Sequence, residues 1–238
     1  MDIGSTALGL CAPPDVMATG LSTVAPTPDT DLPATSAAYR WTKRTFDVVF
    51  SLAVLIVATP LWLLVAFLVG STSRGPVFFR QSRVGRHGRS FTVLKFRSMC
   101  SDAEARLKDL GLYDTYVATG YKLPVADECR VTRVGRFLRK TSLDELPQLL
   151  NVLRGDMSLV GPRPVVPAEL DSYGDLAHCY LAVHPGITGL WQVSGRSHIR
   201  FPERAHLDRD YFHRRSLRFD LAILARTPVA VVRGNGAY

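Results

Sequence analysis

The chain has 238 residues and a formal net charge of +8, which is enough for one compact domain with accessory segments. Its cysteines are widely spaced and form no Cys-x-x-Cys pair; they are Cys11, Cys100, Cys129 and Cys179. This spacing argues against a disulfide framework and a zinc site, and predicts reduced thiols in a cytosolic compartment. The positive charge predicts a polyanionic partner: nucleic acid, anionic lipid or a phosphorylated substrate.

The first 38 residues are rich in Pro, Thr, Ser and Ala and contain almost no aromatic residues. Such a composition cannot bury enough apolar surface to fold, so residues 1–38 are predicted to form a disordered N-terminal arm. The arm also lacks a basic start followed by a continuous apolar core, which excludes a secretory signal.

Residues 39–72 are predicted to contain a basic flank followed by a membrane helix. Residues 48–70 carry no charge, and a helix of that length would reach about 35 Å, enough to span a bilayer. A buried core helix is the alternative, but such helices rarely run this far without a charge. Trp41 and Trp62 suit the interface between membrane and water.

Thr59 and Pro60 interrupt this apolar segment. A proline in mid-helix removes a backbone hydrogen bond and kinks the axis, and the part before it, about 18 Å long, is too short to cross alone. A kinked span and a helix that enters and returns on the same face therefore both remain open. Basic residues belong on the cytoplasmic side, and they flank both ends of the segment, which favours the re-entrant form: Arg40, Lys43, Arg44, Arg74 and Arg80.

Residues 74–97 contain basic residues and no acidic residue. Within them, residues 77–79 and 91–94 predict the two short strands of a hairpin. Anionic lipid headgroups could bind such a patch beside a membrane. Alternatively, Lys95 and Arg97 could bind a substrate phosphate near the end of the second strand, and the residues themselves leave both interpretations open.

Two adjacent carboxylates, Asp144 and Glu145, stand at the start of an apolar helical pattern and shortly after Arg139. Ser142 and Glu145 have the spacing of a capping box, and acidic residues at helix starts are usually caps and nothing more. The sharper interpretation is catalytic, because an acid pair held at the positive end of a helix can bind a divalent metal or attack phosphorus.

A short apolar strand over residues 157–160 leads into Gly161-Pro162-Arg163-Pro164. The two prolines restrict the backbone around Arg163, whose guanidinium could then bind a phosphate through two hydrogen bonds. Standing alone, this motif would be an ordinary turn. Residues 184–191 form a glycine-rich turn, which can bring backbone N–H groups near an anion.

Further helices are predicted over residues 101–111, 166–183 and 202–214. Gly155 suits the C-terminus of the helix that follows Glu145. Residues 219–232 are amphipathic and could lie on the membrane surface or pack on the core.

From about residue 43 onward, the chain resembles the bacterial sugar transferases, which are monotopic polyprenyl-phosphate hexose-1-phosphate transferases. Within that family it is most similar to the enzymes that transfer galactose phosphate to undecaprenyl phosphate. Five ordered motifs carry the resemblance: Lys43-Arg44-Thr45-Phe46-Asp47, Lys95-Phe96-Arg97-Ser98-Met99, the run from Leu138 to Gln148, Gly161-Pro162-Arg163-Pro164, and the run from Pro185 to Gln192.

The resemblance implies roles for particular residues. Asp144 would be the nucleophile and Glu145 its acidic partner, both near Mg²⁺, while Lys95, Arg139 and Arg163 would bind phosphate. Thr59-Pro60 stands where the family usually has Ser-Pro at the re-entrant break. Asp127-Glu128-Cys129-Arg130 departs from the family's usual Asp-Pro-Arg, which affects the expected loop geometry but not the chemistry.

The implied reaction is the transfer of sugar-1-phosphate from a UDP-sugar, UDP-galactose or UDP-glucose, to undecaprenyl phosphate, with release of UMP and through an aspartyl-phosphosugar. This step would begin exopolysaccharide synthesis at the cytoplasmic face of the bacterial inner membrane. The implied partners are both substrates, Mg²⁺ and membrane lipid, with no nucleic acid; a homo-oligomer is left open. A membrane-anchored basic adaptor or nucleic-acid binder is the alternative, but it does not explain the acid pair.

The expected fold class is α/β. It consists of a monotopic membrane protein with an N-terminal re-entrant helix broken by proline, amphipathic interfacial helices and a small cytosolic catalytic domain with a short sheet. The predicted boundaries are residues 1–38 for the arm, 39–72 for the membrane segment and 73–238 for the phosphoglycosyl transferase domain.

Overall fold

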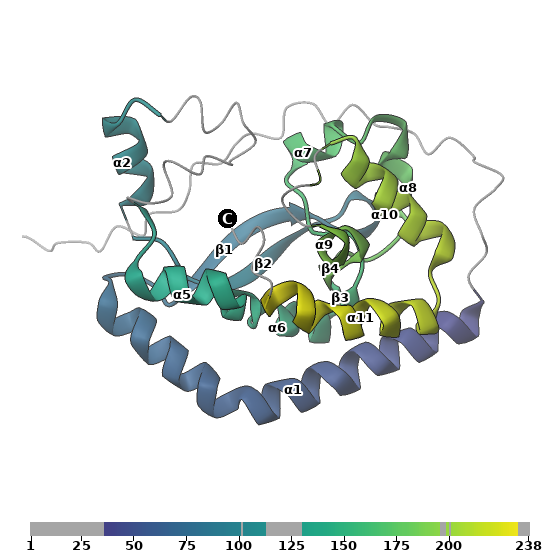
Figure 1. Cartoon of the computed structure of the whole chain (residues 1–238), viewed down its shortest axis with the longest axis horizontal. Coiled ribbons are helices and arrows are strands. Elements are labelled where there is room, and N and C mark those ends of the chain that lie inside the picture. Colours follow the sequence, from purple (N-terminus) through teal and green to yellow (C-terminus); the bar gives the residue numbers. More distant parts are fainter. Residues whose placement is uncertain (1–35, 101, 113–129, 196–198, 200, 233–238) are drawn as a thin grey trace, which may run out of the picture. The chain divides into compact units, whose positions relative to one another are not determined.

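The computed structural model describes residues 36–100, 102–112, 130–195, 199 and 201–232. Contacts divide the chain into one unit over residues 1–32 and another over residues 33–238, and every described residue belongs to the second. The predicted disordered arm, up to residue 35, and the sequence departure at residues 127–129 lie outside the described residues. The second unit combines helices with small sheets, as predicted from the sequence (Figure 1).

The helix α1 spans Ala37–Thr72 and continues through Pro60. Ser36 caps its start by accepting a hydrogen bond from the backbone N–H of Tyr39. Pro60 has no N–H to donate to the preceding turn, and the Thr59 hydroxyl donates to the Leu55 carbonyl at 2.7 Å. Figure 1 shows the axis of α1 bent near its middle, as a proline inside a helix leads us to expect.

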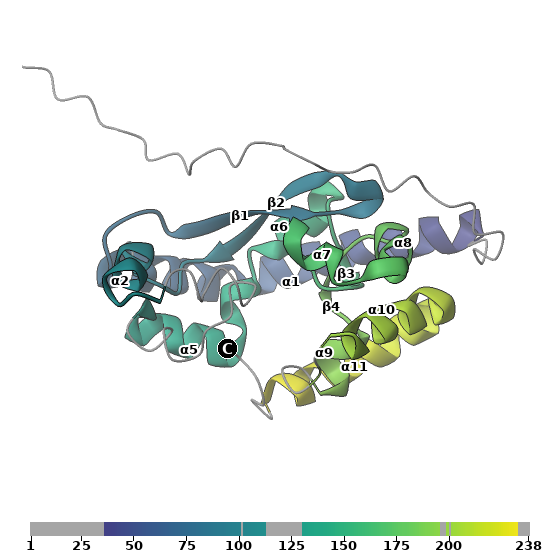
Figure 2. The same cartoon turned by 90° about the horizontal axis from the view of Figure 1, so that it is seen from above.

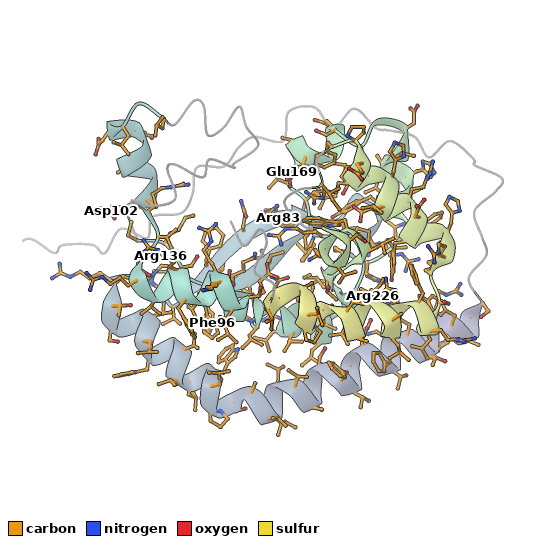
Figure 3. All side chains as sticks on the ribbon, viewed as in Figure 1. Arg83, Phe96, Asp102, Arg136, Glu169 and Arg226 are labelled. Carbon is orange, nitrogen blue, oxygen red and sulfur yellow. The ribbon has the colours of Figure 1, made fainter. Side chains whose placement is uncertain are left out.

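Most of the apolar surface of α1 is uncovered. The most apolar 18-residue window of the helix is only 11% buried, which excludes the alternative of a core helix. By length and composition, α1 is the one helix among the described residues that could cross a membrane. Its most exposed large apolar side chains are Trp41, Val49, Leu52, Ile56, Val57, Leu63, Leu64 and Phe67, and Figure 3 shows side chains of α1 projecting away from the rest of the unit.

Both halves of α1 pack on the same unit. In the first half, Phe46 packs against the core cluster that contains Leu159. In the second half, Val65 and Val69 are buried against Phe96, whose position beside α1 is labelled in Figure 3. Full burial of each such side chain contributes roughly 1.5–3 kcal/mol, so α1 is held at both ends by apolar packing.

Polar contacts fix the first half of α1 more firmly. Lys43 Nζ pairs with Asp220 Oδ2 at 2.8 Å, and Asp220 is almost fully buried and also accepts from the Tyr211 hydroxyl at 2.9 Å. Asp47 accepts a hydrogen bond from the Ser158 hydroxyl at 2.8 Å. The charged residues that precede the apolar segment therefore bind the folded domain.

The predicted hairpin is confirmed. Strands β1, Phe78–Val84, and β2, Ser90–Phe96, pair antiparallel, joined by the 3-10 helix η1 over Arg86–Gly88. Arg83 pairs with Phe91 in the ladder. Because side chains alternate between the faces of a strand, this register places Arg83 on the same face as Lys95.

Asn151 connects the hairpin to the helix α6, Gln148–Arg154. Its Oδ1 accepts from the Leu94 N–H at 3.1 Å, and its Nδ2 donates to the Thr92 carbonyl at 2.7 Å. The side chain is fully buried, so it satisfies backbone groups of β2 that would otherwise be costly to leave unpaired. Gly155 ends α6 in the left-handed conformation, with φ 95°, as predicted.

A second, two-stranded sheet follows α6. Strand β3, Ser158–Val160, pairs in parallel with β4, Gly186–Thr188. The prediction of a glycine-rich turn over residues 184–191 was incomplete, because β4 lies inside it. A Cβ at Gly186 would come within 2.1 Å of the Gly161 backbone nitrogen, so glycine is required for the two segments to approach.

The helical structure predicted over residues 166–183 is present as three short helices and not as one continuous helix. The structure has α7 over Pro167–Asp171, the 3-10 helix η3 over Gly174–Leu176, and α8 over Ala177–Leu181. Gly174 has φ 51°, which lies outside the right-handed helical region and separates the first helix from the other two.

The remaining helices are α2, Ala103–Asp109, α5, Arg133–Thr141, α9, Leu190–Ser194, α10, Glu203–Arg214, and α11, Leu217–Val232. In α11, Ile223 is buried in the core, whereas Val229 and Val232 are exposed, so the helix packs on the core and still carries apolar surface. Figure 2 shows the hairpin and the pair α10 and α11 on opposite sides of the unit.

Candidate active site

The acid pair lies in a tight turn between two helices. Ser142 ends α5 in the left-handed conformation, with φ 57°, and the 3-10 helix η2 follows over Leu143–Glu145. The predicted capping box is wrong, because the Ser142 side chain makes no capping hydrogen bond and α6 begins only after Pro147. A non-glycine residue held in this conformation costs about 1–3 kcal/mol, and such strain clusters at functional sites.

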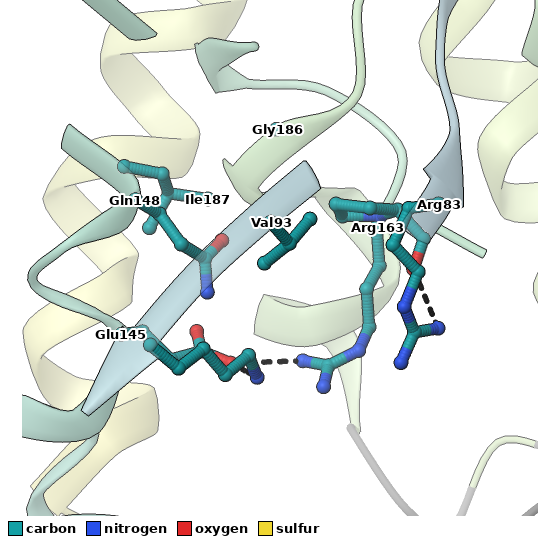
Figure 4. A pocket seen from close by; sticks show the side chains of 9 residues that line it. Arg83, Val93, Glu145, Gln148, Arg163, Gly186 and Ile187 are labelled. Carbon is teal, nitrogen blue, oxygen red and sulfur yellow. Dashed lines mark hydrogen bonds and ion pairs between the residues drawn. The ribbon is translucent and has the colours of Figure 1, made fainter. Parts of the chain in front are cut away.

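Glu145 is held by two cations from distant parts of the chain. Lys95 Nζ, from β2, lies 2.7 Å from Glu145 Oε1, and Arg163 Nη1, from the segment after β3, lies 3.2 Å from the same oxygen (Figure 4). Burial alone would raise the pKa of the Glu145 carboxyl, but Lys95 and Arg163 outweigh it and lower that pKa. Glu145 is therefore ionised at neutral pH.

Asp144 is in the opposite situation. Its side chain is buried, and among the described residues it makes no hydrogen bond and no ion pair. Burial and the neighbouring Glu145 charge raise the pKa of Asp144 to about 6, against the opposing effect of Lys95, Arg163 and Arg139. The carboxylate is thus desolvated, unbonded and close to three cations, which favours reactivity toward an electrophile.

A pocket opens beside the acid pair; Glu145 lines it, whereas Asp144 does not. Its wall contains both cations that hold Glu145 and a third, Arg83, which the sequence did not single out as a site residue. The alternation of the hairpin is the signal that could have identified Arg83, because it shares a face with Lys95. The lining residues are Arg83, Val93, Lys95, Glu145, Gln148, Arg163, Pro164, Gly186 and Ile187 (Figure 4).

The structure does not bring Arg97 to this pocket, which corrects its prediction as a phosphate ligand. Its guanidinium donates to the carbonyls of Val69, Ser73 and Pro76, at and just beyond the end of α1. The last carbonyls of a helix lack partners within the helix and favour a positive charge. Alternation along a strand would keep residues 95 and 97 on one face, but β2 ends at Phe96.

The other predicted site residues occupy two places. Arg139 lies in the last turn of α5, and its charge acts on the pKa of Asp144. Thr59 and Pro60 lie in the middle of α1 and do not line the pocket.

The carboxylates offer a partial metal site. Among the described residues, no three His, Cys, Asp or Glu side chains gather closely enough to hold an ion by themselves. Asp144 and the second oxygen of Glu145 are nonetheless unbonded by described residues. Mg²⁺ is usually bound through one or two carboxylates together with substrate phosphates and water, so the donors present fit that ion.

A comparison with models of protein families identifies the family of this chain. A model described as "Bacterial sugar transferase" matches residues 38–234. This chain belongs to the bacterial sugar transferase family. The family's match begins at the start of α1 and ends just after α11, and so contains every element described above.

Several relatives of this sugar transferase have names that state a reaction or a process. The "Undecaprenyl-phosphate galactose phosphotransferase" of Salmonella typhimurium is 47% identical over 84% of this chain and 42% of its own. "Exopolysaccharide production protein ExoY" of Rhizobium meliloti is 43% identical over 82% of this chain and 88% of its own. "UDP-glucose:undecaprenyl-phosphate glucose-1-phosphate transferase" of Klebsiella pneumoniae is 44% identical over 64% of this chain and 31% of its own. The chain thus spans less than half the length of the Salmonella and Klebsiella relatives.

Proposed function

We propose that this protein transfers sugar-1-phosphate from a UDP-sugar to undecaprenyl phosphate, with release of UMP, as an early step of exopolysaccharide synthesis. One observation carries the proposal: a buried carboxylate, Asp144, which makes no bond to a described residue, stands beside a second carboxylate that Lys95 and Arg163 hold in place. Both substrates are phosphates, so the same cations that hold Glu145 are suited to bind them.

In the first step, an Asp144 oxygen attacks the phosphorus that carries the sugar, and the bond from that phosphorus to the UMP oxygen breaks. The bonding pair leaves with UMP, and an aspartyl-phosphosugar forms. In the second step, an oxygen of undecaprenyl phosphate attacks the same phosphorus and releases the Asp144 carboxylate. The product is the lipid diphosphate sugar.

Positioning and charge are what the protein must supply for this chemistry. Glu145 is fixed by its two ion pairs, so its backbone neighbour Asp144 is held where it can attack. Lys95, Arg163 and Arg139 surround the acid pair and offset the charge that builds up on the transferred phosphoryl group. The desolvated environment strengthens each of these interactions.

Asp144 and Glu145 would hold Mg²⁺ together with the phosphates of the donor. When bound, the ion supplies charge neutralisation on the diphosphate and so assists the departure of UMP. Both the metal and the covalent intermediate belong to the proposal.

The sugar is proposed to be galactose or glucose. The name of the Salmonella relative specifies galactose, and the name of the Klebsiella relative specifies glucose. The two hexoses differ only in the orientation of one hydroxyl.

We further propose that α1 is re-entrant and that the pocket lies on the cytoplasmic face of the inner membrane. Both ends of the helix contact the same domain, through Lys43 and Asp220 at one end and Arg97 at the other. A helix that crossed the bilayer would carry one end away from that domain. Pro60 and the exposed apolar middle of α1 support insertion into one leaflet only.

The proposal is tested by incubating the purified protein with UDP-galactose or UDP-glucose, undecaprenyl phosphate and Mg²⁺, and measuring UMP. We expect wild type to release UMP with one of these donors. Asp144→Asn, which keeps the size but removes the nucleophile, should lose at least about 10³-fold in rate, as removal of a covalent nucleophile generally does.

Asp156→Asn is the matched control, because this acid accepts a hydrogen bond from Asn151 and, among the described residues, pairs with no cation of the pocket, and it should keep its activity. Mass spectrometry of the wild type with donor alone should detect a hexose phosphate adduct on the peptide that contains Asp144. Transfer by Asp144→Asn at the wild-type rate would refute the nucleophile. No UMP release with any UDP-sugar would favour the membrane-anchored adaptor instead.

A further inference from the structure

Two arginines lie side by side in the pocket: Arg163, which pairs with Glu145, and Arg83, which makes no contact with the acid pair. Figure 4 shows the guanidinium groups of Arg83 and Arg163 next to each other, and both residues line the pocket with Lys95. Arg163 reaches Glu145, whereas Arg83 does not. The inference drawn from this pair rests on the function proposed above.

The pair retains hydrogen-bond donors for a ligand. In its bonds to described residues, Arg163 uses only Nη1, and Arg83 uses Nη1 and Nη2, which bond to the Pro164 carbonyl at 3.2 Å and to Gln81 Oε1 at 2.6 Å. The Nε–H of Arg83 makes no bond with a described residue. A planar guanidinium fork matches the oxygens of a phosphate.

The positive charge of this pair is only partly neutralised. Glu169 Oε2 lies 3.4 Å from Arg83 Nη1, but the other oxygen of Glu169 lies 3.8 Å from the buried Arg204. Figure 3 labels Arg83 and Glu169 beside each other. Burial, and then the charge of Arg163, lower the pKa of Arg83 to about 10. An anion between the two guanidinium groups would relieve this repulsion.

In the proposed reaction, UMP and the lipid phosphate must occupy the same side of the transferred phosphorus, one after the other. In-line displacement at phosphorus places the leaving oxygen opposite the attacking one. UMP therefore leaves from the side opposite Asp144. In the second step Asp144 is itself the leaving group, so the lipid phosphate must attack from that same side.

We propose that Arg83 and Arg163 form a single phosphate subsite, opposite Asp144, that holds first the phosphate of the departing UMP and then the phosphate of undecaprenyl phosphate. Arg83 contacts both groups in turn. Lys95 remains with the transferred phosphoryl group beside Glu145.

The test uses steady-state kinetics of the full-length protein. If UMP and undecaprenyl phosphate share a subsite, UMP inhibits competitively against undecaprenyl phosphate and noncompetitively against the UDP-sugar. Arg83→Gln should raise the inhibition constant of UMP and the KM of undecaprenyl phosphate by similar factors, about 10- to 100-fold for a lost charge-assisted phosphate contact.

Arg80→Gln is the matched control, because Arg80 is exposed on the same strand and is not part of the pocket. It should leave both constants unchanged. Arg83→Lys keeps the charge but loses the planar guanidinium group, so it should raise both constants less than Arg83→Gln does. It replaces Arg83→Gln in the test if that variant does not fold.

Noncompetitive inhibition by UMP against the lipid, or an Arg83 variant that raises only one constant, would overturn the shared subsite. These outcomes require an active wild type. A wild-type protein that releases no UMP would refute the proposed function instead, so the two failures can be told apart.

Discussion

Asp144 and Glu145 are adjacent in the chain and yet have opposite electrostatic environments. Glu145 has two cations on one oxygen, at 2.7 and 3.2 Å, whereas Asp144 has no bonding partner among the described residues. Pairs of carboxyl groups whose pKa values are moved apart commonly divide the work of a site. Here the lowered pKa belongs to the positioned residue and the raised one to the proposed nucleophile.

This difference predicts a pH effect. In the metal-free protein Asp144 should titrate near pH 6, well above the value of an ordinary aspartate. Because only the ionised form attacks phosphorus, the fraction of protein with an ionised Asp144 falls as the pH drops through this pKa.

Glu145→Gln removes the repelling charge and leaves Lys95 and Arg163 to act on Asp144, so it should lower the pKa of Asp144. Carboxylate ¹³C NMR, assigned with Asp144→Asn, measures both values; an unchanged or raised pKa in Glu145→Gln would contradict this account.

At the residue scale, the sequence predicted most of the residues that the structure brings together beside Glu145. The acid pair, Lys95 and Arg163 were predicted from their motifs, and the structure brings them together. Arg97 was predicted because it follows the same strand, but β2 ends one residue earlier and its side chain binds the end of α1. Arg83 was missed because its relevance depends on the register of the hairpin, which local sequence does not state.

At the scale of elements, the helix α6 depends on a residue of α1. Arg44 donates from Nη1 to the Val152 carbonyl at 2.6 Å and from Nη2 to the Leu153 carbonyl at 2.9 Å, the last turn of α6. Carbonyls in the last turn of a helix lack the usual partner four residues further on, and the Val152 carbonyl otherwise accepts from the capping N–H of Gly155 at 3.1 Å. The helix α1 therefore completes the helix that follows the acid pair.

Arg44→Met should weaken this connection. The variant keeps much of the apolar stem and removes two charge-assisted hydrogen bonds, so we expect a loss of about 1.5–3 kcal/mol in the free energy of unfolding. Thermal and urea unfolding in detergent measure it. The exposed Arg226→Met on α11 is the control and should change stability by less than about 0.5 kcal/mol. Equal stability of the two variants would mean that Arg44 is not a cap of α6.

Element types were predictable where a single pattern dominated. The alternation of the hairpin and the uninterrupted apolar run of α1 gave the correct elements. Gly174 divided a predicted helix through its positive φ, and β4 was hidden within a turn-like composition because its glycine is needed for packing against Gly161. The break at Gly174 and the strand β4 both depend on contacts with residues distant in sequence.

At the scale of the whole molecule, the second unit holds α1 at both of its ends. Its first half packs near Leu159 and its second half near Phe96. The exposed apolar residues lie between these two attachments. A helix fixed in this way and bent at Pro60 can enter one leaflet and return.

The topology can be tested with single cysteines in a background that lacks the four native ones. Thr42→Cys and Arg74→Cys place one thiol at each end of α1, at exposed positions. A membrane-impermeant maleimide should label neither site in intact cells and both after the cells are opened. Labelling of just one site from outside would establish a span and refute the re-entrant form.

In the proposed re-entrant form, the attachment of α1 at both ends also determines how the proposed lipid acceptor is encountered. An enzyme embedded in a single leaflet meets its isoprenoid substrate by lateral diffusion, in two dimensions. Its rate should then follow the mole fraction of that substrate in the bilayer, and diluting vesicles in buffer at constant lipid composition should leave turnover per enzyme unaltered.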